Sequence, residues 1–183
     1  RIWHNWWART LLALWLLAVG VWMFYPASRS MPVTSPFEYA QITNFTDSAV
    51  APSLSPDGRM LTFKRGEDAF LSSGQIYVKL LPNGEPVRLT NDGDSKFAPV
   101  FTPDGSRIAY TRVDASGWNT WTVPVLGGQA TQFLPNASGL TWIADQRILF
   151  SEIKTDLHMG IVTSSESRAD HREIYFPANE RAM

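Results

Sequence analysis

Few side chains in this sequence have the types and spacing that catalysis or metal binding requires. The histidines are His4, His158 and His171, and they form no His-Glu-x-x-His motif or other paired spacing that would hold zinc. Cysteine is absent, and so are a Gly-x-Ser-x-Gly nucleophile motif, a Gly-x-x-x-x-Gly-Lys phosphate loop and the catalytic-loop signature of a kinase. We therefore expect no catalytic residue, no metal site and no cofactor in these residues.

Two aspartates could be imagined as a pair for acid–base chemistry. Asp57 and Asp104 each stand in a Pro-Asp-Gly sequence, before Gly58 and Gly105. In such a turn the carboxylate can accept a hydrogen bond from a following backbone N–H, and the glycine takes a positive φ. We interpret all four residues as structural turn residues.

The run Asn91-Asp92-Gly93-Asp94-Ser95 places oxygen ligands close together, as a calcium site would. It lacks the spaced ligands and the closing glutamate of a calcium loop. A surface turn is the preferred interpretation, with calcium binding as the alternative.

An internal repeat indicates the elements that position these residues. Residues 51–63, Ala-Pro-Ser-Leu-Ser-Pro-Asp-Gly-Arg-Met-Leu-Thr-Phe, return as residues 98–110, and the match extends upstream to residues 43–48. A third, weaker copy contains Trp-Ile-Ala-Asp at 142–145, which we also interpret as a turn, and Arg-Ile-Leu-Phe at 147–150.

A second pair of strands follows each copy. We expect these strands at residues 76–80, 87–90, 120–125 and 131–134, joined through Asn83-Gly84 and Gly127-Gly128, dipeptides favoured in two-residue hairpins. Four short strands in about 45 residues is the length of a propeller blade. The sequence therefore predicts an all-β fold of about three four-stranded blades.

The pattern resembles the TolB-type, WD-like β-propeller repeat over residues 43 to about 176. The resemblance implies an exported bacterial protein: an accessory propeller of a peptidase, a TolB-like scaffold, or the propeller behind the membrane helix of a receptor-like serine/threonine kinase or winged-helix regulator. Three blades cannot close a ring, so we expect further blades beyond Met183.

Tryptophan residues offer the clearest candidates for recognition. Trp121 and Trp142 fall on strand positions that Tyr77 and Phe101 occupy in other copies, which favours packing within the blades. Trp118 instead lies in a predicted loop. We predict Trp118, with Asp114 and Asn119 of the same loop, as a ligand- or partner-binding site.

The N-terminal residues predict a transmembrane helix. Residues 6–25 would span about 30 Å as a helix, with aromatic residues at both ends and Pro26 as a stop. Arg9 lies one turn inside, where its side chain can reach the headgroups, and the positive flank places the N-terminus in the cytoplasm. The alternatives are a cleaved signal peptide ending before Met31 and a buried helix of a soluble domain.

The predicted organisation is a membrane helix with its cytoplasmic flank at 1–26, a linker at 27–42 and a partial propeller at 43–183. An apolar content of 44% fits a folded chain, and a net charge of -1 without a basic stripe argues against nucleic-acid binding. We expect a non-enzymatic module of the inner membrane, with its propeller in the periplasm or outside the cell. Its partner would be a protein or small ligand.

Overall fold

The computed structural model divides the chain into two compact units, Arg1–Gln41 and Ile42–Met183. The structure describes residues 11, 14–17, 19, 40–67, 73–143, 146–155 and 158–176.

In the first unit, Leu11, residues 14–17 and Val19 are helical. The large apolar side chains at 11 and 14–17 are between 58% and 66% exposed. Among the residues that the structure describes, no helix combines the length and apolar character needed to cross a membrane. The helix predicted at 6–25 and the linker at 27–42 lie mostly outside the described residues, and both stay predictions.

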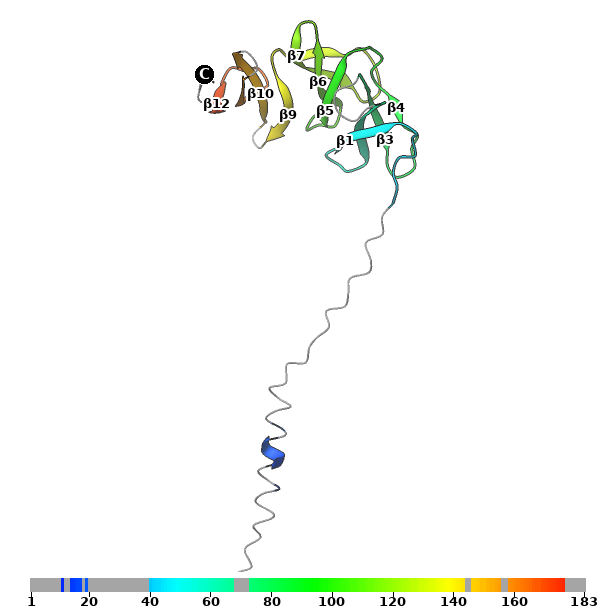
Figure 1. The fold of residues 1–183 in the computed structure, drawn as a ribbon, viewed down its shortest axis with the longest axis vertical. Helices are drawn as coiled ribbons and strands as arrows, with labels where there is room; N and C mark the ends of the chain where they lie inside the picture. Colours follow the sequence, from blue (N-terminus) through cyan, green and yellow to red (C-terminus); the bar gives the residue numbers. More distant parts are fainter. Residues whose placement is uncertain are drawn as a thin grey trace, which may run out of the picture. The chain divides into compact units, whose positions relative to one another are not determined.

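The described part of the second unit forms three four-stranded antiparallel sheets (Figure 1). The first sheet comprises β1 (Ser48–Leu54), β2 (Met60–Gly66), β3 (Gln75–Leu80) and β4 (Val87–Arg88). The second comprises β5 (Ser95–Phe101), β6 (Arg107–Asp114), β7 (Gly117–Pro124) and β8 (Thr131–Leu134). The third comprises β9 (Ser138–Ile143), β10 (Arg147–Thr155), β11 (His158–Ser165) and β12 (Arg172–Tyr175).

This architecture confirms the predicted all-β fold of four-stranded units, but several connections differ from the expectation. Strands β3 and β4 are joined by residues 81–86, and β7 and β8 by residues 125–130, so neither connection is a two-residue hairpin. Gly127 and Gly128 have positive φ, whereas Gly84 does not. The expected loop from Asp114 to Asn119 is shorter than predicted, because β6 ends at Asp114 and β7 begins at Gly117.

Two apolar clusters hold neighbouring sheets together. Between the first and second sheets, Ile76, Ile108 and Val123 are completely buried. Between the second and third, Ile148 and Val162 are completely buried and Phe150 is 2% exposed. Burying side chains of this size contributes about 1.5–3 kcal/mol each, so the packing of sheet on sheet stabilises the fold.

The first strand of each sheet contains a left-handed residue. Ala51 has a φ of 53°, Ala98 of 46° and Gly139 of 62°, and each lies at an irregularity in the pairing with the following strand. Contacts join β1 to β5 and β5 to β9, so these strands are neighbours. The repeat therefore includes a β-bulge in each of the three first strands.

An ion pair is also repeated. Arg65 Nε lies 2.8 Å from Asp47 Oδ1, and Arg112 Nη2 lies 2.7 Å from Asp94 Oδ2. Each guanidinium also faces an aromatic ring of the third strand in its sheet, at 5.5 Å for Tyr77 and 4.4 Å for Trp121. In each of the first two sheets, the arginine thus ties the segment before the first strand to the third strand.

The third sheet departs from this pattern. Glu152 stands at the position in the third copy of the repeat that Arg112 has in the second copy. Its Oε2 lies 2.7 Å from Lys154 Nζ and 3.2 Å from His171 Nε2. The third copy therefore keeps the strands of the repeat but reverses the charge at this position.

Candidate functional site

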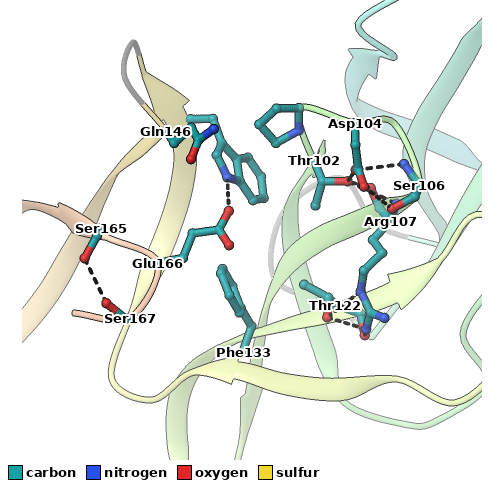
Figure 2. A pocket seen from close by; sticks show the side chains of 12 residues that line it. Thr102, Asp104, Ser106, Arg107, Thr122, Phe133, Gln146, Ser165, Glu166 and Ser167 are labelled. Carbon is teal, nitrogen blue, oxygen red and sulfur yellow. Dashed lines mark hydrogen bonds between the residues drawn. The ribbon is translucent and has the colours of Figure 1, made fainter. Parts of the chain in front are cut away.

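A pocket of about 620 Å³ lies between the second and third sheets (Figure 2). This volume is within the range of small-molecule binding sites. The second sheet contributes the β5–β6 turn and parts of β6, β7 and β8, and the third contributes the end of β9 and the turns around Gln146 and Glu166. The lining residues used below are Asp104, Arg107, Phe133, Trp142 and Glu166.

One rim of the pocket is the Pro-Asp-Gly turn between β5 and β6. Asp104 Oδ1 accepts from the Thr102 hydroxyl at 2.5 Å and from the Ser106 backbone N–H at 3.1 Å, while Oδ2 accepts from the Ser106 hydroxyl at 2.7 Å. These hydrogen bonds, first that of Thr102, lower the pKa of Asp104 to about 2. Three hydrogen bonds therefore hold this carboxylate in the turn, and it is ionised at neutral pH.

The β1–β2 turn of the first sheet repeats this geometry. Asp57 Oδ1 accepts from the Ser55 hydroxyl at 2.6 Å and from the Arg59 N–H at 3.1 Å, which lowers the pKa of Asp57. Gly58 and Gly105 both have a φ of 69°, as a turn with glycine in the left-handed region requires. The structure thus places all four predicted turn residues in matching hydrogen-bonded turns.

Arg107 forms part of the pocket wall on the second sheet. Its Nε and Nη2 donate to the Thr122 hydroxyl at 3.1 and 2.6 Å, and Nη2 donates to the Thr131 hydroxyl at 2.9 Å. In the described part of the chain, Arg107 forms no ion pair and its Nη1 donates no hydrogen bond. Neutral oxygen atoms thus fix the guanidinium without compensating its charge.

The rest of the lining is aromatic and acidic. The rings of Phe133 and Trp142 are nearly parallel, with an interplanar angle of 18° and centroids 6.5 Å apart. Trp142 Nε1 donates a hydrogen bond to Glu166 Oε1 at 2.9 Å, and Figure 2 shows Glu166 beside Phe133. The indole orientation is therefore set by a carboxylate that itself lines the pocket.

The turn that carries Glu166 is held by Asp170. Its Oδ1 accepts from the Ser165 backbone N–H at 2.5 Å, and its Oδ2 pairs with Arg147. The hydrogen bond from the Ser165 N–H, followed by the Ser165 side chain and the pairing with Arg147, lowers the pKa of Asp170. Glu166 thus stands on a fixed turn rather than on a free loop.

A smaller pocket of about 330 Å³ adjoins this site at the ends of the first strands. It is lined by Leu54 of β1, by Phe101 of β5 and by Ile143 of β9, and it shares Pro103 and Trp142 with the larger pocket. Trp142 therefore contributes to both pockets.

The residues predicted as a binding site lie at the other end of β6. Trp118 stacks on Phe97 with centroids 5.7 Å apart, and Asn119 is buried, with its Oδ1 accepting from the Asn136 N–H at 3.0 Å. Asp114 accepts from the Ser116 N–H at 2.7 Å, and its hydrogen bonds with Ser116 lower its pKa. The structure brings the three residues together around a tight turn and engages each in an intramolecular contact.

The residues that line the larger pocket are not predicted from the sequence as a binding site. The repeat predicts that Trp142 packs within the blades, where Phe101 stands in the second copy, and Trp142 does pack against the apolar cluster between the second and third sheets. Phe101 is 6% exposed, whereas the larger indole is only partly buried and extends into the pocket. A larger ring at a repeated packing position is the one sequence signal that could have indicated the site.

The alternative of a calcium site at residues 91–95 receives no support from the side-chain contacts. Asp92 pairs with the buried Lys96 and Asp94 pairs with Arg112. Within the described ranges, no group of three His, Cys, Asp or Glu side chains is arranged to hold a metal ion.

Three four-stranded antiparallel sheets that pack on one another in chain order are blades of a β-propeller. Comparison with solved structures agrees. TolB from Acinetobacter baumannii is 20% identical with a TM-score of 0.63, over 74% of this chain and 34% of that one. A putative TolB from Agrobacterium tumefaciens is 16% identical with a TM-score of 0.60, over 72% and 50%.

A puromycin-hydrolysing peptidase from Mycobacterium tuberculosis is similar to the same extent, with 16% identity and a TM-score of 0.60 over 75% of this chain and 23% of that one. The chain thus spans half or less of each of these three structures. No family model and no curated protein matches the sequence. At such low identity the similarity shows the fold alone.

Proposed function

We propose that this chain is the binding module of a membrane-tethered, extracytoplasmic β-propeller that senses a ligand or docks a protein for signalling. The observation that carries the proposal is the pocket between the second and third sheets. It combines an aromatic wall with charged and hydroxyl groups that hydrogen bonds hold in place. Pockets of this composition bind ligands, and preorganised groups lose little entropy on binding.

The tether is proposed from the apolar N-terminal sequence. Leucine and tryptophan side chains at 14–17 are largely exposed on helical backbone, and a bilayer would cover them. The positive residues before this segment favour a cytoplasmic N-terminus, which puts the propeller in the periplasm or outside the cell.

Binding through the pocket is tested with the full chain in lipid nanodiscs. Peptides selected from a random display library are measured against the natural chain, Trp142→Ala and Tyr175→Ala. Tyr175 is the matched control, because it is an aromatic side chain that is 57% exposed and does not line the pocket. We expect Trp142→Ala to weaken binding about tenfold or more and Tyr175→Ala to leave it unchanged. Equal binding by all three proteins would contradict the pocket as the binding site.

The tether is tested by labelling and extraction in bacterial cells. The chain has no cysteine, so Leu126→Cys introduces a single thiol at a side chain that is 96% exposed. An impermeant maleimide should label this thiol in intact spheroplasts, and alkaline carbonate should leave the chain in the membrane. Release by carbonate, or a mature N-terminus near Met31, would instead indicate a soluble scaffold after signal cleavage.

The similarity to peptidase structures supports one alternative, an accessory propeller of an exported serine peptidase. Sequencing the reading frame on both sides of this chain separates the two functions. An upstream kinase or winged-helix domain would support the receptor, and a downstream Gly-x-Ser-x-Gly segment would support the peptidase.

A further inference from the structure

We propose that the pocket between the second and third sheets binds a Lys or Arg side chain of an extended peptide segment. The aliphatic stem would lie against Phe133 and Trp142, and the cationic head would pair with Glu166. This assignment rests on the proposed binding function and specifies its ligand.

The charges of the lining residues favour a cation. Asp104 and Glu166 contribute two carboxylates and Arg107 one guanidinium, so the described lining has a net charge of −1. Glu166 Oε1 accepts from Trp142, while Oε2 has no partner in the described part of the chain. A carboxylate with a free oxygen atom can accept a charge-assisted hydrogen bond from a ligand.

The aromatic wall favours the same ligand. The negative face of an indole or phenyl ring attracts cations, with tryptophan the strongest of the aromatic residues. Lysine and arginine also have apolar stems that pack against rings while their heads stay hydrated or paired. A neutral apolar side chain could use the rings, but it would leave Glu166 without a counter-charge.

The position of Arg107 favours a peptide over a small free cation. Arg107 faces the pocket from the side opposite Glu166 (Figure 2), and its Nη1 has two N–H groups without partners among the described residues. A backbone carbonyl of an extended peptide can accept from Nη1. The volume of about 620 Å³ leaves room for this backbone beside one long side chain.

The experiment uses one selected peptide in versions that differ only at the central residue: Lys, Arg, acetyl-lysine, norleucine or Glu. Binding to the full chain in nanodiscs is measured by fluorescence polarisation at about 0.02 and 0.2 M salt. Each peptide is measured with the natural chain, Glu166→Gln and Glu85→Gln. Glutamine keeps a hydrogen-bond acceptor for Trp142 Nε1. Glu85 is an exposed carboxylate in the connection between β3 and β4, and it does not line the pocket.

We expect the Lys and Arg peptides to bind about tenfold more tightly than the norleucine and acetyl-lysine peptides, with the difference reduced at high salt. Glu166→Gln should remove this preference, and Glu85→Gln should keep it. The acetyl-lysine comparison needs no protein variant, so it decides the question even if Glu166→Gln folds poorly.

Two results would overturn this inference and leave the proposed function intact. One is peptide binding through the pocket without preference for a basic residue. The other is complete competition by free cadaverine at the peptide's own affinity, which would indicate a small-cation site. If no peptide binds the natural chain through the pocket, this inference fails together with the proposed docking of a protein through the pocket.

Discussion

Replacing Ala51 by glycine tests the left-handed residue that the first strands share. Ala51 lies in β1 with a φ of 53° and an exposed side chain, so the change removes an unfavourable backbone conformation without removing a buried contact. Ala49 is a matched control two residues earlier in the same strand. It is also exposed and is not one of the residues with positive φ.

The expected magnitudes follow from the backbone alone. A left-handed conformation costs an L-residue about 1–2 kcal/mol, whereas glycine loses roughly 0.5–1 kcal/mol more entropy on folding than alanine. Ala51→Gly should therefore raise the free energy of unfolding by about 0.5–1 kcal/mol, and Ala49→Gly should lower it by a similar amount. Gly139→Ala should also destabilise, although a Cβ at position 139 would have no heavy atom within 4 Å.

Urea unfolding of the full chain in nanodiscs, followed by tryptophan fluorescence, measures these differences by linear extrapolation. The slopes of the three variants should equal that of the natural chain, which shows that the same transition is compared. If Ala51→Gly destabilises as much as Ala49→Gly, the bulge does not impose the left-handed backbone on which the reasoning depends.

Three further outcomes are expected. In a double-mutant cycle, Asp94→Asn and Arg112→Gln should show a coupling of about 0.5–1 kcal/mol in the free energy of unfolding, because both side chains are only partly exposed. A coupling near zero would contradict the structural role of this pair. The pKa of Asp104 is about 2 in the folded chain against an ordinary 3.8, so its contribution to stability is present above about pH 4 and is lost as the pH falls through 2. Asp104→Asn should therefore flatten the dependence of the free energy of unfolding on pH over that interval, as measured by circular dichroism. Trp118→Ala should lower the free energy of unfolding by about 1 kcal/mol through loss of the stacking of Trp118 on Phe97. If this variant instead keeps the natural stability but binds a partner more weakly, the result would support the binding site predicted from the sequence at Trp118.

The repeat in the sequence determined the fold class. Strand and turn preferences are local, so matching residues at 51–63 and 98–110 specify matching hairpins wherever they occur in the chain. The Pro-Asp-Gly turns agree in detail, since Asp57 and Asp104 accept hydrogen bonds from the second residue after them. The connections were less predictable: Asn83-Gly84 is a hairpin dipeptide, yet residues 81–86 form a longer link between β3 and β4.

Only the tertiary structure decided where the candidate site lies. Trp118 and Trp142 are both partly buried tryptophans near strand ends, but one stacks on Phe97 of its own sheet and the other lines a pocket between two sheets. Arg107 and Glu166 come from different sheets, and their joint contribution to one pocket depends on how the third sheet packs on the second. Local sequence specifies hydrogen bonding within each sheet, whereas a pocket between sheets depends on side-chain packing between residues far apart in the chain.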